Sequence, residues 1–144
     1  METMIPEIID FIRESNAIER IFREPLQDEI DEFIRFKSLK VITVDELVRF
    51  VSVYQPNATL RDRLGLDVRV GSYIPPKGGP YIKENLANLL TQPLDAYHLH
   101  IAYEKLHPFT DGNGRSGRML WAYKMKSLRS GFLLNFYYQT LQNS

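Results

Sequence analysis

The chain of 144 residues has the length of a single domain, and its 44% hydrophobic and 25% charged residues are typical of a folded globular protein. Its 18 basic side chains equal its 18 acidic ones, and this balance argues against nucleic acid or an anionic membrane as a partner, because both attract a surplus of positive charge. The absence of cysteine excludes disulfides and thiolate metal sites, and it makes a reducing cytoplasm the simplest location.

Helical periodicity dominates the N-terminal third of the chain. An apolar stripe from Ile5 to Ile12 predicts a first helix that runs to about Phe22, and Pro25 suits the first turn of a second. A third helix is expected after "TVDE" at 43–46, which has the form of a capping box. No apolar run approaches the roughly 18 residues of a membrane helix, and the acidic N-terminus is unlike a signal peptide.

The stretch "DVRVGSYIPPKGGPYIKENL" interrupts this pattern. Apolar residues alternate on both sides of a turn rich in proline and glycine, which predicts a small β-hairpin at 68–82. A surface loop between helices explains the same stretch equally well. Pro93 then opens a helix that should end at about His107, because the residue before a proline is biased out of the α region. A further helix from Gly114 to about Gly131 completes an all-α architecture with one hairpin.

The main functional signal is "HPFTDGNGRSGR" at 107–118, called the signature segment below. The glycine–asparagine–glycine turn at 112–114 precedes a helix, so it can point successive backbone amides into one concavity, where phosphate is the usual ligand. Arg115 and Arg118 are three residues apart and project from one face of the first helical turn. Because each guanidinium can bind phosphate oxygens through paired hydrogen bonds, the segment predicts a site for a di- or triphosphate.

Two further side chains of the segment suit chemistry on a phosphate chain. Asp111 would repel phosphates by itself, but bridged by Mg²⁺ it would orient them. His107 has an ordinary pKa near neutrality, so its neutral imidazole can take the proton from an incoming hydroxyl. Phe109 lies between polar positions and is expected to point inward and anchor the segment.

Each of these features alone has a structural explanation: a core histidine, an ordinary turn, a solvated pair of arginines. The combination is harder to explain in that way, because a base, a metal-ready acid, an anion-binding turn and two arginines on one face occur together. The chain has no G-x-x-x-x-G-K-[ST] stretch, so it is not a P-loop protein. Zinc is not expected either, because the three histidines lack a paired-ligand spacing with acids.

The signature segment resembles that of the Fic family, H-x-F-x-[DE]-G-N-G-R-x-x-R, at every defined position. The similarity runs from about Asp45 to Gly131. Within it, "HLHIAYEKLHPF" resembles the helix before the motif, including a histidine seven residues ahead of His107, which is His100. "RVGSYIPPKGGPYI" resembles the hairpin that the family calls the flap.

The resemblance implies a Fic-type helical bundle over residues 1–144, with the flap next to the active site. It also implies a nucleotidyltransferase that moves AMP from ATP to a Ser, Thr or Tyr hydroxyl of a target protein. In that reaction His107 would be the general base and Asp111 the Mg²⁺ ligand. The residues expected to bind the phosphates are Gly112, Asn113, Gly114, Arg115 and Arg118.

The resemblance assigns roles outside these residues as well. Tyr73 and Ile74 of the flap would hold the target segment by strand-like main-chain pairing, and His100 would support the core. The related Doc toxins have lysine where this chain has Gly114, and they transfer phosphate from a reversed nucleotide. Gly114 therefore favours AMP transfer, although other family members use CDP-choline or UTP.

The N-terminus matches the family in one further place. Many Fic proteins are inhibited by a helix with the motif [ST]-x-x-x-E-[GN], and "SNAIER" places Ser15 four residues before Glu19. The glutamate in such helices pairs with the second signature arginine, here Arg118, and competes with the γ-phosphate. We therefore expect residues 1–23 to contain an inhibitory helix, although Arg20 replaces the usual glycine or asparagine and a chance match is common on a charged helix.

Three alternatives to AMP transfer remain open at this point. The chain could transfer another nucleotide-derived group, remove AMP from a target, or act as a silent nucleotide-binding module in a toxin–antitoxin or phage system. His107 and Asp111 argue against silence, because pure binding needs no base beside the phosphates. The expected location is the cytoplasm of the producing cell, or of a host after delivery. The acceptor protein is unspecified, and a homo-oligomer is compatible with the sequence.

Overall fold

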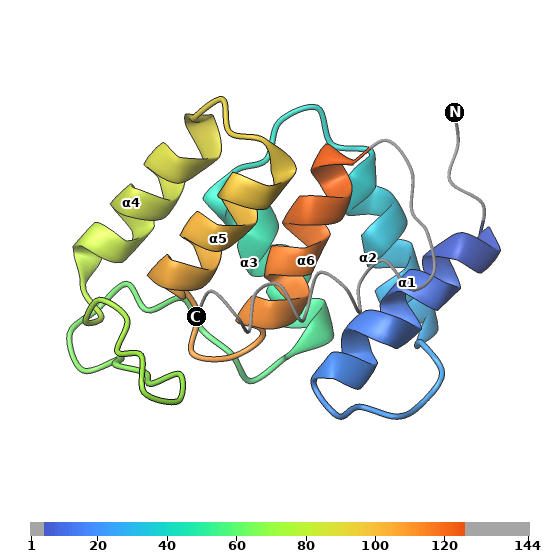
Figure 1. Cartoon of the computed structure of the whole chain (residues 1–144), viewed down its shortest axis with the longest axis horizontal. Coiled ribbons are helices and arrows are strands. Elements are labelled where there is room, and N and C mark those ends of the chain that lie inside the picture. The colour runs from blue at the N-terminus through green and yellow to red at the C-terminus, as the bar shows by residue number, and fades with distance from the viewer. Residues whose placement is uncertain (1–4, 126–144) are drawn as a thin grey trace.

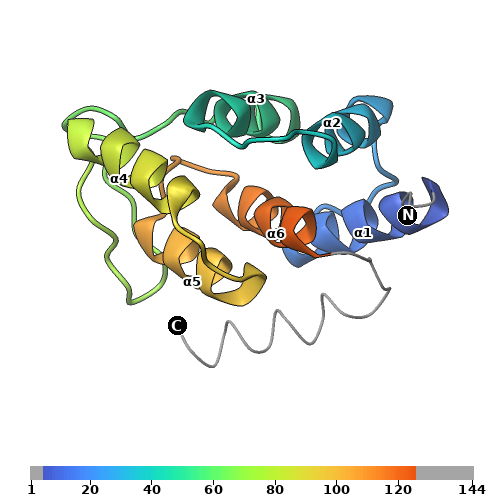
Figure 2. The ribbon, with the colours of Figure 1, turned by 90° about the horizontal axis from the view of Figure 1, so that it is seen from above.

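Helices form most of residues 5–125, the part of the chain that this computed structural model describes. In chain order they are α1 (Ile5–Ile18), α2 (Gln27–Lys37), α3 (Val44–Tyr54), α4 (Pro80–Thr91), α5 (Ala96–Leu106) and α6 (Asn113–Lys124). Figure 1 shows α6 beside α5 and α1, with α3 and α2 behind them. From above, α2 and α3 form one layer, α6 and α1 lie next to it, and α4 and α5 close one end (Figure 2). The all-α prediction is confirmed.

The helix that carries the signature arginines lies at the centre of this bundle. α6 packs against α1, α2, α3 and α5, and nearly all of its residues are buried. Met119, Leu120 and Trp121 provide its apolar contacts to the core, which aromatic rings from α1, α2 and α3 complete. A helix with neighbours on every side is held rigidly, so groups at its N-terminus have fixed positions.

Several predicted helix ends are confirmed and others are wrong. α5 ends at Leu106 with His107 as its C-cap, as the following proline predicted, and the Thr43 side chain caps α3 by accepting from the Glu46 N–H. Pro25 and Pro93 both lie ahead of their helices: α2 begins at Gln27, and α5 begins at Ala96 after the Asp95 cap. α6 ends at Lys124, where the next residue is extended, and the remaining residues of the predicted helix lie outside the described range.

The predicted hairpin at 68–82 is not a hairpin. Its only paired residues are Val70 and Tyr73, which form one isolated antiparallel bridge across a turn. The residues from Pro80 onward form α4, with the proline in the first helical turn, where its missing N–H costs nothing. We call the segment between α3 and α4 that contains this turn the 62–79 loop. The prolines and glycines of its second half cannot sustain a strand ladder.

The first helix is shorter than its apolar stripe predicted. α1 ends at Ile18, and the Asn16 carbonyl accepts from the N–H groups of both Glu19 and Ile21. Arg20 adopts a left-handed backbone with φ of 62°. This conformation is costly for a residue with a Cβ and is the one that glycine and asparagine adopt readily. Glu19 therefore lies in a turn just beyond the helix rather than within it.

Within residues 5–125, every helix is too short or too polar to cross a bilayer.

Candidate active site

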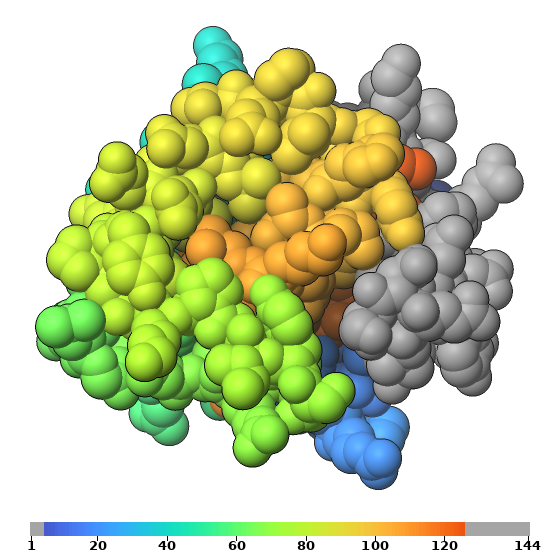
Figure 3. Space-filling model, turned by 60° about the vertical axis from the view of Figure 1, so that its left-hand side comes forward, coloured from blue at the N-terminus to red at the C-terminus, as the bar shows by residue number. Residues whose placement is uncertain are grey.

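The signature segment forms one wall of a cleft of about 480 Å³. The opposite side is formed by Glu19 and Ile21 just after α1, by Gln55 at the end of α3, and by 68–70 of the 62–79 loop. Figure 3 shows the green 62–79 loop below the orange signature segment, with the blue end of α1 nearby. Segments that are far apart in the sequence thus meet around His107, Asp111 and the glycine turn.

His107 is held in an uncommon backbone conformation at the end of α5. Its φ is 50°, in the left-handed region, and its N–H donates to the Tyr103 carbonyl at 2.9 Å. Its own carbonyl accepts from Nε of Arg61 at 2.7 Å. These contacts turn the chain out of α5 and bring the imidazole to the cleft. A strained residue that its surroundings hold in place is frequently a functional one.

The turn at 112–114 is fixed by side chains as well as by its glycines. Gly112 has φ of 79°, and a methyl group there would lie 3.3 Å from both Val51 Cγ1 and Gln55 Cβ. The Asn113 side chain accepts from the Phe109 N–H at 2.9 Å and donates to the Phe109 carbonyl at 2.8 Å. Because that amide is already used, Asn113 can contribute only its backbone N–H to an anion at the α6 N-terminus.

Arg115 is buried against α1 and α3. Its Nη2 donates to Gln55 Oε1 at 2.6 Å, its Nη1 donates to Asn16 Oδ1 at 3.4 Å, and the guanidinium lies 5.8 Å from the centre of the Tyr54 ring. Nε has no hydrogen-bond partner in the described part of the chain, although it is buried. A buried cation whose partners are mostly neutral amides keeps its positive charge available to an anion in the cleft.

Arg118 is bound to the residues that the inhibitory motif predicted. Nε donates to Ser15 Oγ at 2.8 Å, and Nη2 donates to the Ser15 carbonyl at 3.0 Å and to Glu19 Oε1 at 2.8 Å. Glu19 also covers the glycine turn, because a methyl group on Gly114 would lie 2.2 Å from the same Oε1. The Glu19 carboxylate thus occupies the space in which an anion would meet both the turn and Arg118.

The environment of His107 favours its neutral form. Desolvation lowers the pKa of His107 below its usual value, and the nearby Arg61 charge lowers it further. Nδ1 is buried and has no hydrogen-bond partner among the described residues. A neutral imidazole at pH 7 is the form that can accept a proton.

His100 behaves differently although it lies on the same helix. Its side chain is buried, and desolvation lowers its pKa to about 4, with the Arg118 charge acting in the same direction. A ring that stays neutral down to that pH and does not line the cleft is suited to packing. Phe109, with 1% of its surface exposed, anchors the segment in the core as expected.

Glu104 of α5 lies against Gly117 of α6, and no pattern in the sequence marks it. Its Oε1 is 3.7 Å from His100 Nε2, and a methyl group on Gly117 would lie 2.8 Å from the same oxygen. Desolvation raises the pKa of Glu104 to about 7 even though 32% of the side chain reaches solvent, because the carboxylate end lies against α6. This carboxyl therefore titrates in the same pH range in which His107 would work.

Asp111 is exposed at the mouth of the cleft, where its Oδ1 accepts from the Gly112 N–H at 2.8 Å. No group of three His, Asp or Glu side chains within residues 5–125 is placed to bind a metal ion by itself. A single carboxylate beside an anion site does fit Mg²⁺, which commonly takes one or two carboxylates together with substrate phosphate oxygens. The residues present are thus compatible with a metal ion that arrives with a nucleotide.

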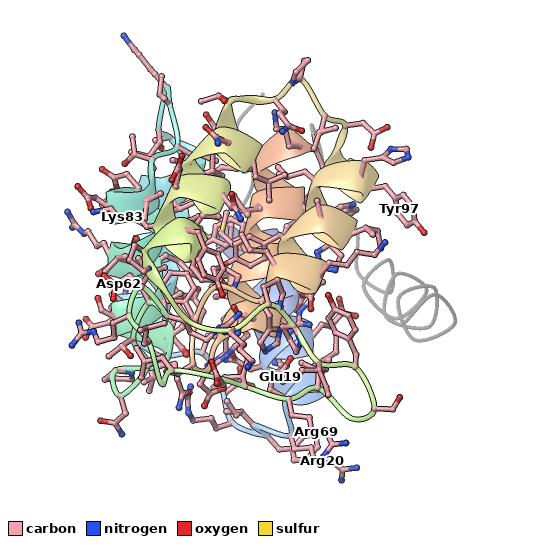
Figure 4. All side chains as sticks on the ribbon, turned by 90° about the vertical axis from the view of Figure 1, so that its left-hand side faces the viewer. Glu19, Arg20, Asp62, Arg69, Lys83 and Tyr97 are labelled. Atoms are coloured by element: carbon pink, nitrogen blue, oxygen red, sulfur yellow. The ribbon has the colours of Figure 1, made fainter. Side chains whose placement is uncertain are left out.

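The flap residues expected from the sequence lie outside the cleft lining. The Tyr73 hydroxyl donates to the Lys105 carbonyl at 2.8 Å, and the Ile74 side chain is 67% exposed. The residues of the 62–79 loop that line the cleft are Val68, Arg69 and Val70. Figure 4 shows Arg69 beside Glu19 and Arg20, and Lys83 and Tyr97 apart from them.

Three residues that position this site gave no signal in the sequence. Asn16, Gln55 and Arg61 contact signature residues from 99, 60 and 46 positions away. Nothing in their local patterns distinguishes them from surface polar residues.

Comparison with known proteins agrees with this geometry. The model of the Fic/DOC family matches residues 48–124, which include α4, α5, α6 and the whole signature segment. No curated protein matches the chain.

Proposed function

The chain belongs to the Fic/DOC family, and on that premise we propose that it transfers AMP from ATP to a Ser, Thr or Tyr hydroxyl of a target protein. The observation that carries the proposal is the convergence on one cleft of His107, Asp111 and the α6 N-terminus with Arg115, while Arg118 lies directly behind Glu19 of the same cleft and bonds to it. A base, a metal-ready acid and an anion site within one volume suit displacement at phosphorus. A base, a metal-binding acid or an anion site by itself would not indicate this reaction.

The residues support a direct transfer. The acceptor oxygen attacks the α-phosphorus, a new P–O bond forms, and the bond from that phosphorus to the bridging oxygen of the β-phosphate breaks. Pyrophosphate leaves, and the hydroxyl proton passes to His107, whose lowered pKa keeps the ring neutral beforehand. General base catalysis of this kind contributes roughly 10²–10⁴ in rate.

The phosphate chain of ATP would lie along the N-terminus of α6. Backbone N–H groups of the first turn are oriented by the Asn113–Phe109 contacts, and Arg115 and Arg118 supply positive charge. Asp111 would hold Mg²⁺, which when bound neutralises charge on the phosphate oxygens. Gly114 favours AMP transfer over phosphate transfer, because Doc toxins have a lysine at this position.

We further propose that Glu19 restrains this activity. The γ-phosphate and the Glu19 carboxylate would both bind Arg118 and lie over Gly114, so one excludes the other. The glutamate side chain is 41% exposed, and its bond to Arg118 is correspondingly screened and breakable. A restraint of this strength can be displaced without unfolding the domain.

The test is labelling with Mg-ATP carrying the label on the α-phosphate, with and without cell lysate, for wild type, Glu19→Gly and His107→Ala. Glu24→Gly is the matched control, because Glu24 is an exposed glutamate of the same α1–α2 connection, and its side chain pairs with Arg13 alone among residues 5–125. We expect label with Glu19→Gly, little with wild type or Glu24→Gly, and none with His107→Ala. ATP binding should persist in His107→Ala.

Other outcomes point to the remaining functions. Label that transfers only from the γ-phosphate would indicate a kinase. Label from CTP or UTP but not from ATP would indicate another donor, and loss of AMP from a labelled lysate would indicate removal. ATP binding without transfer in any of these assays would leave a binding module as the function.

A further inference from the structure

Arg61 is the largest wholly buried side chain among the described residues, although it lies in a loop. Its guanidinium replaces the lost water with four hydrogen bonds, and every acceptor is a backbone carbonyl. No carboxylate within the described range pairs with this guanidinium. A buried arginine that binds only main chain is unusual, because a charge normally leaves water only to meet an opposite charge.

The four bonds connect two separate parts of the cleft wall. Nη1 donates to the carbonyls of Leu66 at 3.1 Å and Pro76 at 2.8 Å, which lie on either side of the 67–75 turn. Nε donates to the carbonyl of His107, the C-cap of α5, at 2.7 Å, and Nη2 donates to the carbonyl of Leu106, the last residue of α5, at 3.0 Å. One rigid, planar group therefore closes the base of the turn and joins it to His107.

The backbone around Arg61 reinforces the same connection. Its N–H donates to the Pro108 carbonyl at 2.8 Å, and its carbonyl accepts from Gly79 at 3.0 Å. Gly78 is packed so closely that a methyl group there would lie 2.6 Å from the Leu66 carbonyl oxygen. The turn is thus fixed at its base, while its tip at Ile74 is open to solvent.

We propose that Arg61 is a positioning residue that sets the place of the 67–75 turn relative to the imidazole of His107. This inference rests on the proposed function, in which His107 takes the proton, and on the family resemblance, which implies that Tyr73 and Ile74 of this turn hold the target segment. Because rates depend on the placement of reacting atoms to within about 1 Å, a shift between these two parts would slow transfer without weakening ATP binding.

Arginine suits this role better than lysine. Its five donors lie in one plane and can reach carbonyls on opposite sides, whereas the three donors of lysine share one nitrogen. The C-terminal end of α5 carries partial negative charge, which compensates the buried cation. Arg61→Lys therefore keeps the charge but cannot keep all four bonds.

The test compares Arg61→Lys and Arg61→Met with the control Arg63→Met, each in a Glu19→Gly background. Arg63 lies two residues further along, is 75% exposed, and within residues 5–125 its side chain pairs only with its neighbour Asp62. Three quantities are measured: hydrogen exchange at the Tyr73 and Gly78 amides, the affinity for Mg-ATP, and the rate of AMP labelling at saturating ATP. Hydrogen exchange of Phe33 in α2 reports overall stability.

We expect exchange at Tyr73 and Gly78 to accelerate at least about tenfold in both Arg61 variants, with Phe33 much less affected. Labelling should fall about 10- to 100-fold, while ATP affinity stays within about twofold. Arg63→Met should have the same exchange rates, ATP affinity and labelling rate as the Glu19→Gly parent. Unchanged exchange at Tyr73 and Gly78 would overturn the proposal, and so would a uniform acceleration that includes Phe33, because Arg61 would then serve only general stability.

Failure of the proposed function would be visible separately. If the Glu19→Gly parent transfers no label, the hydrogen-exchange pattern still decides whether Arg61 holds the turn. The His107 ring signals in NMR spectra then decide whether Arg61 positions the imidazole. A shift of these signals in both Arg61 variants but not in Arg63→Met supports the proposal, and unchanged signals refute it.

Discussion

The two sides of the cleft are built in different ways. The signature segment is fixed by buried contacts within the core: Asn113 to the Phe109 backbone, Ser116 to the Gly112 carbonyl, and Arg61 to His107. On the other side, α1 packs into the core through Phe11, and its end meets Arg118 and Arg115 through Ser15 and Asn16. Glu19, in the turn just after α1, bonds to Arg118 and is partly exposed. The first side is preformed, and on the second side only the Glu19 contact with Arg118 is partly exposed, so we call Glu19 and this contact the docked side.

This difference assigns catalysis to the preformed side and the proposed restraint to the docked side. Changes on the preformed side should reduce both stability and transfer, because the loop geometry depends on the core. Changes on the docked side should alter how much transfer occurs and leave the fold almost untouched. Four experiments test that separation, beginning with the largest expected effect.

Asn113→Ala should be the most damaging of these changes. It leaves the Phe109 N–H and carbonyl buried without partners, which costs about 2–4 kcal/mol and lowers Tm by roughly 5–15 °C. AMP labelling in a Glu19→Gly background should fall about 100-fold. Asn88→Ala on the exposed face of α4 is the control, and thermal unfolding is the measurement. Equal Tm values for the two variants would mean that the loop does not depend on this side chain.

The pH dependence of transfer should identify His107 as the base. Because its pKa is lowered, labelling should be constant above about pH 6.5 and should fall with decreasing pH, about tenfold per unit once below the pKa. The profile is best recorded in Glu19→Gly/Glu104→Gln, since the pKa of Glu104 at about 7 would otherwise add a second titration near Arg118. A rate that still rises through pH 8 would contradict this assignment.

Ser15→Ala should weaken the docking of Glu19 by removing a buried contact between α1 and Arg118. The change removes the bond from Arg118 Nε to Ser15 Oγ, so we expect basal labelling to rise about fivefold, which corresponds to about 1 kcal/mol. Ser52→Ala, whose hydroxyl bonds only to the Arg49 carbonyl on an exposed face, is the control. In a Glu19→Gly background the increase should largely disappear, because both changes release the same contact. If the effects of the two changes on basal labelling were fully additive, Ser15 would act independently of Glu19.

Arg20→Asn should have the smallest effect, and in the opposite direction. Asparagine tolerates the left-handed backbone of this position better than arginine, so the docked state should gain up to about 1 kcal/mol and basal labelling should fall a few-fold. Arg20→Ala removes the same charge but keeps the strain. If asparagine and alanine give the same basal rate, backbone strain at position 20 does not limit docking.

Local patterns and the signature motif predicted the fold class, one helix end and the partners of Arg118, but not the loops that surround the cleft. The all-α fold, the end of α5 before Pro108 and the burial of Phe109 follow from local rules and are confirmed. His100 is buried too, as the family resemblance implied. The contacts of Ser15 and Glu19 with Arg118 agree with the inhibitory motif. These successes depend on short-range patterns or on a long, specific motif.

The errors come from places where local patterns are ambiguous. Val68 and Val70 alternate as they would in a strand, but in the structure Val68, Arg69 and Val70 all line the cleft and only Val70 takes part in a single bridge. Pro80 lies within the predicted hairpin, but proline is also a common first residue of a helix, and here it begins α4. No glycine or proline marks the end of α1, so only the backbone of Arg20 reveals it. Arg61 and Gln55 act across long separations, which no periodicity encodes.

The closeness of Gly114 to Glu19 has an evolutionary consequence. Any side chain at position 114 would meet the Glu19 carboxylate, and that carboxylate is the free end of a flexible side chain, so it can move at little cost to the fold. A single nucleotide change from glycine to alanine would therefore be tolerated structurally while it loosened the restraint. In a lineage with this fold, the choice of residue 114 and the persistence of Glu19 cannot drift independently.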